Sequence, residues 1–391
     1  MASSVLFVSN TSSHGVTRVG VVGAGQLARM MGEASHEVAV SITVLAASSD
    51  EPAVATCDHV VLGEARDRAA IEQLSEAVDV ITFDHELVDL EHLAELEARG
   101  VPVRPSTAAL RFAVDKAYQR QALASAGLPV PRFLVVRSCD DPRVSAFLDE
   151  LDGPAVLKTS RGGYDGRGVL FANTRDEALT MIDELAVTGD VLIEEKLELR
   201  SEVAQLVARA VDGSMMLYPL VTTVQSHGMC VEVRYPAQAP TNLVREASDL
   251  TMRIASLIDV VGILAIEYFI TDAGLVVNEV ALRPHNSGHW TIEGAQTSQF
   301  ANHLLAVSGR ALGETAPTTG YAVMVNLVGG ERTSSLRAAL DVPGAFVHDY
   351  GKSWRPGRKL GHVTALSDDA RSAHVTAWES ARAYGTQTQE T

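Results

Sequence analysis

Two glutamates on either side of a predicted tight turn carry the first chemical signal in this chain. Apolar β-forming residues lead to Glu267, a short Asp/Gly cluster follows at 272–274, and a second apolar segment returns through Glu279, which predicts a β-hairpin. If the loop is those three residues, Thr271 opposes Leu275 and Glu267 opposes Glu279. Opposed carboxylates about 5 Å apart destabilise a strand pair, unless a cation such as Mg²⁺ lies between them and also bridges substrate phosphates. The alternative is a surface hairpin with two solvated glutamates.

The segment that follows the hairpin favours an active site over a surface hairpin. It reads Arg283-Pro-His285-Asn286-Ser-Gly-His289 and concentrates polar and basic side chains beside the carboxylate pair. We therefore interpret this region as the candidate active site.

A glycine-rich loop follows a lysine at the end of another predicted strand. Lys158 closes that strand, and the loop at 162–168 contains four glycines together with Tyr164, Asp165 and Arg167. Glycine lets backbone amides approach an anion closely and lets a loop close as a lid, and the lysine can reach nucleotide phosphates. Because the lysine precedes the glycines, this is not a P-loop. A mobile hairpin tip is the alternative.

Two further clusters have the chemistry to bind parts of a nucleotide. The apolar segment that ends in Glu194 and Glu195, with Glu202 shortly after it, offers a strand edge for an adenine and a carboxylate for a ribose, or is an ordinary strand end. Four cations lie between Lys352 and Lys359 in an acidic chain. They predict a phosphate clamp, with a solvated basic loop as the alternative.

The elements that position these residues begin with an α/β segment. Strands predicted at 18–22, 41–46 and 78–83 alternate with helical stretches up to residue 107, which indicates a parallel sheet. A helix is predicted at 115–126, and it is followed by a Gly/Pro-containing boundary.

Two turns of this α/β segment have candidate functions. Gly23-x-Gly25-x-x-Ala28 matches a dinucleotide fingerprint, but a nicotinamide oxidoreductase would need an acid at the end of the second strand, where the chain has Ala46 and Ala47. A tight turn that needs glycine for close packing is the alternative. Asp84 and Glu86 follow a predicted parallel strand, and ligands bind at this end of the strands in open α/β sheets. The alternative is that these acids cap the next helix.

Composition predicts a globular protein of two to three domains. Of the 391 residues, 46% are hydrophobic and 21% charged, and the net charge is −17, which disfavours nucleic acid and anionic membranes as partners. Three widely spaced cysteines favour a reducing cytoplasm over a disulfide framework. We expect a disordered extension at 1–16, domains at 17–107, 108–197 and 198–370, and a polar tail at 371–391 that frays.

Taken together and in this order, these segments resemble the ATP-grasp superfamily, and within it the family of 5-(carboxyamino)imidazole ribonucleotide synthases of purine biosynthesis. The resemblance spans roughly residues 17 to 365. The most specific motifs are the glycine-rich loop, the segment from Asn278 to His289, and the segment from Arg355 to His362. The fold implied is an N-terminal Rossmann-like parallel-sheet domain, a small lid domain and a larger mixed α+β domain.

The resemblance implies a role for each candidate residue. For ATP, Lys116 and Lys158 would contact the phosphates, the adenine slot would be lined by Glu194, Glu195 and Leu197, and Glu202 would hold the ribose. Two Mg²⁺ ions would be bound by Glu267 and Glu279. The substrate would be contacted by Glu86, Tyr164, Asp165 and Arg167, its 5′-phosphate would be bound by Lys352 and Arg358, and bicarbonate would be held by Arg283, His285 and Asn286. The chain departs from the family pattern at Ala281, where an Asn is common in the superfamily, and at Leu282, where the family usually has Pro.

The implied reaction is ATP-dependent transfer of bicarbonate to the exocyclic amine of aminoimidazole ribonucleotide through carboxyphosphate, in a cytoplasmic homodimer whose partners are small molecules. Either His285 or Asp165 would take the amine's proton. A formate-using or biotin-carboxylating ligase would share the ATP and metal machinery. A nicotinamide oxidoreductase is the alternative from a different class.

Overall fold

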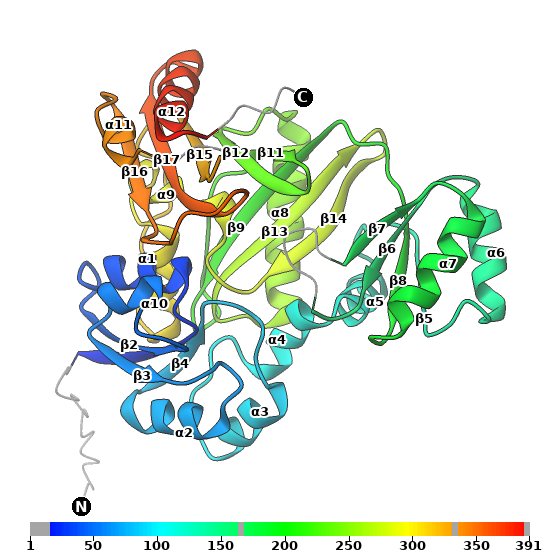
Figure 1. The fold of residues 1–391 in the computed structure, drawn as a ribbon, viewed down its shortest axis with the longest axis horizontal. Helices are drawn as coiled ribbons and strands as arrows, with labels where there is room; N and C mark the ends of the chain where they lie inside the picture. The colour runs from blue at the N-terminus through cyan, green and yellow to red at the C-terminus, as the bar shows by residue number, and fades with distance from the viewer. Residues whose placement is uncertain (1–15, 163–167, 331–334, 387–391) are drawn as a thin grey trace, which may run out of the picture.

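The computed structural model describes residues 16–162, 168–330 and 335–386. Within these residues the strands form three sheets, and Figure 1 shows one of them, a small sheet at the right of the view, standing apart from the other two. The proposed extension at 1–16 lies almost wholly outside the described residues. No helix in the described part of the chain combines the length and the apolar character that crossing a bilayer requires.

The N-terminal unit is a parallel sheet in the order β3-β2-β1-β4 with helices on its faces. The three strands predicted here are confirmed to within two residues. The bounds are β1 Thr17–Val22, α1 Gln26–Ser35, β2 Val40–Ala46, η1 Pro52–Ala55, β3 His59–Leu62, α2 Arg68–Ala77, β4 Val80–Phe83 and α3 Leu90–Ala98. The near-continuous burial of β1, β2 and β4 is typical of a sheet covered on both faces.

The turn from β1 into α1 is closed by a carboxylate of the chain itself. Asp84, directly after β4, accepts from Gly25 N and from Ala28 N, each at 2.8 Å. A Cβ on Gly25 would lie 2.4 Å from Asp84 Oδ2, so this position requires glycine for close approach. The amides and the positive end of the helix dipole that would attract a cofactor phosphate therefore already hold an anion, which argues against a dinucleotide here.

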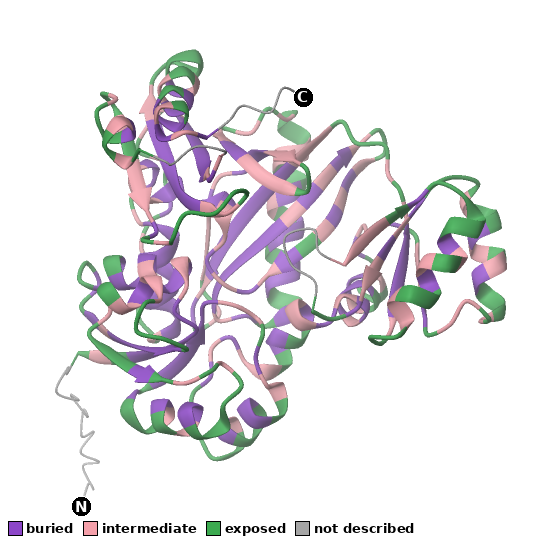
Figure 2. Ribbon diagram, in the orientation of Figure 1, coloured by how far each residue is buried: buried purple, intermediate pink, exposed green. Residues whose placement is uncertain are grey.

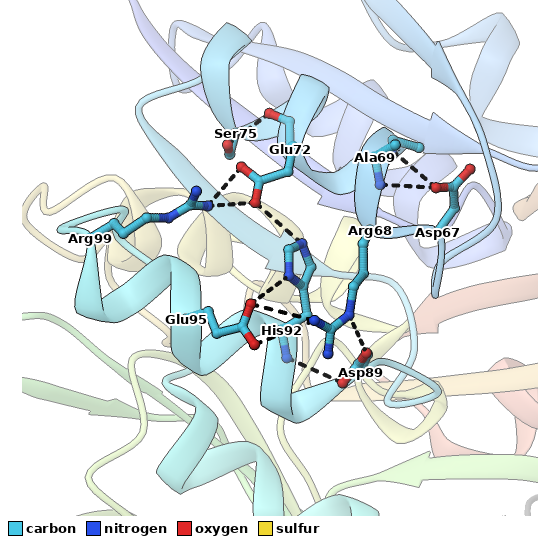
Figure 3. A network of polar contacts seen from close by, with 10 residues as sticks. Asp67, Arg68, Ala69, Glu72, Ser75, Asp89, His92, Glu95 and Arg99 are labelled. Carbon is cyan, nitrogen blue, oxygen red and sulfur yellow. Dashed lines mark hydrogen bonds and ion pairs between the residues drawn. The ribbon is translucent and has the colours of Figure 1, made fainter.

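A polar network joins the two outer helices of this unit (Figure 3). Arg99 reaches Glu72 on α2 at 2.6 Å, and Arg68 reaches Glu95 on α3 at 3.3 Å. His92, whose side chain is 3% exposed, lies between the carboxylates of Glu72 and Glu95 at 3.7 and 3.5 Å. The network ties α2 to α3 at the bottom of the N-terminal unit in the view of Figure 1.

Two helices lead from this unit to a small antiparallel sheet in the order β5-β8-β6-β7. The bounds are α4 Thr107–Val114, α5 Lys116–Ser125, β5 Phe133–Val136, α6 Pro142–Leu151, β6 Ala155–Thr159, β7 Val169–Ala172, α7 Arg175–Ala186 and β8 Val191–Glu195. Apolar residues of α6 and α7 pack on one face of this sheet. The sheet and its two helices form the lid unit at the right of Figure 1.

The large sheet is antiparallel in the order β14-β13-β9-β11-β12-β15-β17-β16, with β10 paired to β9. The bounds of its strands and of the helices between them are β9 Ser201–Arg209, β10 Met215–Leu217, β11 Val221–Ser226, β12 Met229–Tyr235, α8 Thr241–Ile258, β13 Gly262–Thr271, β14 Gly274–Ala281, η2 Asn286–Gly288, α9 Thr291–Gly294, α10 Gln299–Val307, β15 Tyr321–Val328, α11 Leu336–Leu340, β16 Ala345–Asp349 and β17 Lys359–Ser367. Figure 2 shows the buried residues concentrated along β9 and β13.

The expectation of a frayed tail after residue 370 is wrong for most of that segment. Helix α12, Ala370–Tyr384, packs on β15 and β17 through Ala373, Ala377, Trp378, Ala381 and Tyr384. These residues recur at the three- and four-residue spacing of one helix face. Polar residues on the other face hid this pattern. Residues 387–391 lie outside the described part.

We predict that Asp84→Ala lowers the free energy of unfolding by about 1–2 kcal/mol, because two amides at the start of α1 lose their acceptor. Urea denaturation of the variant would measure this. Asp50→Ala, which removes an exposed carboxylate in the same unit, is the matched control and should change stability by less than about 0.5 kcal/mol. Equal effects of the two substitutions would contradict the capping role.

Candidate functional site

The hairpin of β13 and β14 brings Glu267 and Glu279 directly opposite each other, as predicted, but by a different route. The turn is one residue shorter than expected, since Thr271 pairs with Gly274 rather than with Leu275. That register alone would place Asn278 opposite Glu267. A β-bulge between Glu267 and Tyr268 inserts Asn278 as an extra residue and restores the Glu267–Glu279 pair.

Cations lie around this carboxylate pair. Lys116 Nζ, at the start of α5, is 3.0 Å from Glu279 Oε1. The half-exposed Glu279 carboxylate loses part of its hydration, which favours its protonation, but the ammonium groups of Lys116 and Lys158 outweigh this and hold the pKa of Glu279 below its usual value. Burial and the charges of Glu279 and Glu202 raise the pKa of Glu267 to about 7. The pKa values of the two opposed carboxylates therefore shift in opposite directions, and the charge of Glu267 is the one that nearby cations do not balance.

Lys158 reaches the site from the lid unit and is held there by a buried charge chain. Its Nζ is 2.7 Å from Glu194 Oε2, and Arg120 Nε is 2.5 Å from Glu194 Oε1. Burial would raise the pKa of Glu194, but Lys158 and Arg120 hold it below its usual value. A fully buried carboxylate with two cations is thus kept ionised.

Arg120, on α5, also fixes the bulge. Its Nη1 donates to Val277 O at 2.8 Å and its Nη2 donates to Asn278 O at 2.9 Å. Its planar fork can satisfy both carbonyls at once. One side chain therefore connects the register of Glu279 with the lysine of the lid. Nothing in the local sequence pattern distinguishes Arg120 from a surface arginine of a helix, so its role could not be predicted from the sequence.

The segment after β14 lies beside the glutamates, as predicted. His285 Nε2 is 3.7 Å from Glu267 Oε1, and Arg283 Nε is 2.9 Å from Glu86 Oε1. Burial, Arg283 and Lys359 lower the pKa of His285 to about 3, so the imidazole is neutral. Its Nδ1 accepts from Ser287 N at 3.3 Å, which leaves the proton on Nε2, the atom that faces Glu267.

Asn286 offers an unused amide next to this imidazole. Both polar atoms of its side chain are buried, and among the described residues only the weak thiol of Cys230 interacts with them. A buried amide without strong partners is costly, so this position suits a ligand that satisfies it.

The basic segment approaches the N-terminal unit from the loop between β16 and β17. Lys352 Nζ donates to Gln26 Oε1 at 2.6 Å, at the start of α1. Arg358 bonds its own loop through Ser353 O at 3.1 Å and Ser353 Oγ at 2.9 Å. Lys359, at the start of β17, lowers the pKa of both Glu267 and His285, so this end of the loop lies near the glutamate pair.

Of the remaining predicted site residues, Glu202 lies near the pair, since its charge helps to raise the pKa of Glu267, while the others that are described have different partners. Glu202 on β9 pairs with Phe269 of β13, and burial raises its pKa. The carboxylate of Glu195 instead holds Arg132, at 2.8 Å. Leu197 follows β8 and is half-buried. Tyr164, Asp165 and Arg167 lie outside the described residues.

The glutamate pair has the donor chemistry for Mg²⁺. Hard carboxylate oxygens are the ligands this ion prefers. The pKa of Glu267 is raised mainly by burial and then by the charge of Glu279, and a bound cation would offset both effects. Among the described residues no group of three or more His, Cys, Asp or Glu side chains is arranged to hold a metal ion alone. Two carboxylates supply only part of an octahedral shell, so phosphate and water oxygens would complete it.

Three family descriptions match the chain: a ribonucleotide synthetase preATP-grasp domain at residues 16–114, an ATP-grasp domain at 121–300, and a phosphoribosylaminoimidazole carboxylase C-terminal domain at 322–376. N5-carboxyaminoimidazole ribonucleotide synthase of Mycobacterium tuberculosis is 44% identical to this chain over an alignment that covers 90% of this chain and 84% of the relative. The structure of N5-carboxyaminoimidazole ribonucleotide synthetase from Thermus thermophilus is 35% identical to this chain with a TM-score of 0.86, and the match covers 95% of this chain and 100% of that structure. The Aspergillus clavatus enzyme in complex with ADP and 5-aminoimidazole ribonucleotide is 28% identical to this chain with a TM-score of 0.85, and the match covers 95% of this chain and 99% of that structure.

The parallel N-terminal sheet, the lid and the large antiparallel sheet around paired glutamates define an ATP-grasp ligase. Within that superfamily, the chain belongs to the family of N5-carboxyaminoimidazole ribonucleotide synthases.

We predict that Arg120→Lys raises the KM for ATP about tenfold, because a single ammonium cannot hold both bulge carbonyls and a small displacement at such a site is costly. Phosphate release as a function of ATP concentration would measure this. Arg99→Lys, in the exposed pair with Glu72, is the matched control and should leave the KM unchanged. An unaltered ATP KM in Arg120→Lys would show that Arg120 does not support the nucleotide site.

Proposed function

We propose that this chain joins bicarbonate to the exocyclic amine of 5-aminoimidazole ribonucleotide, with ATP converted to ADP and phosphate, in purine biosynthesis. The observation that carries the proposal is the opposition of Glu267 and Glu279 beside Lys116, Lys158 and His285. Names and ligands of the relatives support the choice of substrates, since one related structure holds ADP with 5-aminoimidazole ribonucleotide.

The chemistry requires activation of a poor electrophile. Bicarbonate is anionic, and transfer of a phosphoryl group from ATP would give carboxyphosphate, a mixed anhydride with a good leaving group. Lys158 and Lys116 would offset the negative charge that develops on the transferred group. Mg²⁺ bound by Glu267 and Glu279 would supply further charge neutralisation and orient the phosphates.

Arg283, His285 and Asn286 are proposed to hold bicarbonate. In the tautomer set by Ser287 N, His285 presents an N–H at Nε2, so we assign it as a hydrogen-bond donor to a bicarbonate oxygen. That leaves Asp165 as the candidate base for the amine's proton. Arg283 is kept in place by its ion pair with Glu86.

The remaining roles concern the nucleotides. Lys352 and Arg358 are proposed to bind the substrate 5′-phosphate, while Glu86, Tyr164, Asp165 and Arg167 contact the substrate near the reacting amine. Glu194, Glu195, Leu197 and Glu202 are assigned to the adenosine of ATP, with Glu195 acting through its backbone because its carboxylate is engaged by Arg132. Closure of the lid over the intermediate would exclude water, which would otherwise hydrolyse it.

The proposal also includes two Mg²⁺ ions, a homodimer and a cytoplasmic location. The three cysteines are unpaired, which suits a reducing compartment. Apart from a second copy of the chain, only small molecules are proposed as partners.

The reaction itself can be tested by omission of substrates. Phosphate release in the presence of ATP and Mg²⁺ should depend on both bicarbonate and 5-aminoimidazole ribonucleotide. Formate with glycinamide ribonucleotide is the competing pair and should give no release above background. Release with that pair would move the assignment to a formate-using ligase.

We predict that Glu279→Gln abolishes ATP turnover, with a loss of about a hundredfold or more, since a ligand carboxylate that also pairs with Lys116 is removed. Phosphate release across a range of Mg²⁺ concentrations would measure it. Glu246→Gln, an exposed change on α8, is the control and should behave like the unmodified protein. Full magnesium-dependent activity in Glu279→Gln would refute the metal assignment.

We predict that Lys352→Ala raises the KM for 5-aminoimidazole ribonucleotide about tenfold, because a charged phosphate contact is lost, while the bicarbonate KM stays nearly unchanged. Arg371→Ala removes an exposed cation from α12 and controls for the change in net charge. The phosphate-clamp role fails if Lys352→Ala and Arg371→Ala give the same KM for this nucleotide.

A further inference from the structure

Helix α10 is the element from which the proposed bicarbonate segment is held. Every residue of this helix, Gln299–Val307, is buried, and the helix lies between the N-terminal unit and the large sheet (Figure 1). His303 anchors it to both, through Thr82 Oγ1 at 2.8 Å and Ile263 N at 3.1 Å. The helix is therefore a fixed support in the middle of the molecule.

The first residue of this helix, Gln299, bonds both backbone groups of His285. His285 N donates to Gln299 Oε1 at 2.8 Å, and Gln299 Nε2 donates to His285 O at 2.8 Å. The same Nε2 lies 3.0 Å from His289 Nδ1. The Gln299 side chain is fully buried. One amide thus holds the beginning and the end of the segment 285–289.

The segment is shaped to receive this amide. A Cβ on Gly288 would lie 2.5 Å from Gln299 Oε1 and 2.4 Å from Leu206 Cδ2, so only glycine allows the backbone to pass so close. Thr291 adds a further link, since its hydroxyl donates to Gly288 O at 2.6 Å and accepts from Gln299 N at 2.9 Å. The backbone between His285 and Thr291 is thereby fixed against the start of α10.

We propose that Gln299 is a positioning residue for bicarbonate: it does not touch the anion, but it fixes the backbone from which His285 Nε2 and the Asn286 amide are directed. This inference rests on the proposed role of these two residues. Their alignment with the reacting atoms must be held within fractions of an ångström, and side chains on a short segment cannot achieve this without support from a rigid element.

The same helix provides a matched control. Asn302 is also a buried amide with three hydrogen bonds: its Nδ2 donates to Tyr218 Oη at 2.8 Å and to Gly313 O at 3.1 Å, and its Oδ1 accepts from Gly313 N at 2.8 Å. None of these partners belongs to the segment 285–289. Asn302→Leu and Gln299→Met are both near-isosteric losses of a buried amide, and they should destabilise the protein to a similar extent.

The test is the dependence of phosphate release on each substrate in the full chain. Gln299→Met should raise the bicarbonate KM on the order of ten- to a hundredfold, with the KM values for ATP and 5-aminoimidazole ribonucleotide changed by less than about threefold, and excess bicarbonate should restore much of the rate. Asn302→Leu should leave all three KM values nearly unchanged. An equal rise of all three KM values in Gln299→Met would mark a merely structural role and overturn the inference.

Two further variants make the test complete. Gly288→Ala crowds both the Gln299 amide and Leu206 without removing either side chain, so it should reproduce the selective rise in bicarbonate KM even if Gln299→Met folds poorly. Asn286→Ala separates this inference from the proposed function. If Asn286→Ala raises the bicarbonate KM and neither Gln299→Met nor Gly288→Ala does, the positioning inference alone is wrong. If Asn286→Ala has no effect, the bicarbonate assignment fails and the inference falls with it.

Discussion

The repulsion between Glu267 and Glu279 is the constraint on which the rest of the site depends. Strand pairing places these two carboxylates opposite each other, and a partly buried environment weakens the screening that water would provide. Lys116 and Lys158 favour the ionised form of Glu279, whereas the pKa of Glu267 rises to about 7. The protein compensates one member of the pair and leaves the other with a deficit of positive charge. This imbalance is a physical reason for a cation at this place.

Holding such a pair requires rigid support from more than one unit. The bulge at Asn278 sets the register of the hairpin, Arg120 satisfies the carbonyls that the bulge leaves, and Glu194 links Arg120 to Lys158 on the lid. Removal of one member would leave a buried charge without its partner, which is far more costly than loss of an exposed ion pair. The lid, helix α5 and the hairpin therefore share one electrostatic network. A change at the hairpin would be transmitted to the lid through a few short contacts.

The sequence predicted the parallel strands and the hairpin well, because hydrophobic patterning and turn residues are local signals. It placed Glu267 opposite Glu279 correctly while it assigned the wrong turn length, since two errors of one residue cancelled: the shorter turn and the unforeseen bulge. Helix α12 was missed because polar residues on its outer face hid the spacing of the alanine-rich face that packs on the sheet. Arg120 and Gln299 could not be identified from the sequence. Their importance comes from backbone groups distant in the chain, and no local pattern marks those partners.

The carboxylate of Asp84 has a consequence for how ligands stabilise this protein. Turns of this type commonly rely on a bound phosphate to neutralise the start of the helix, whereas here the chain provides that anion permanently. The N-terminal sheet is therefore complete at this turn without a nucleotide. Stabilisation by mass action belongs to the parts that contact the ligand, so nucleotide binding should tighten the lid and hairpin far more than this turn. Protection from amide exchange would then divide the molecule into a region that is already ordered and a region that becomes ordered with its substrates.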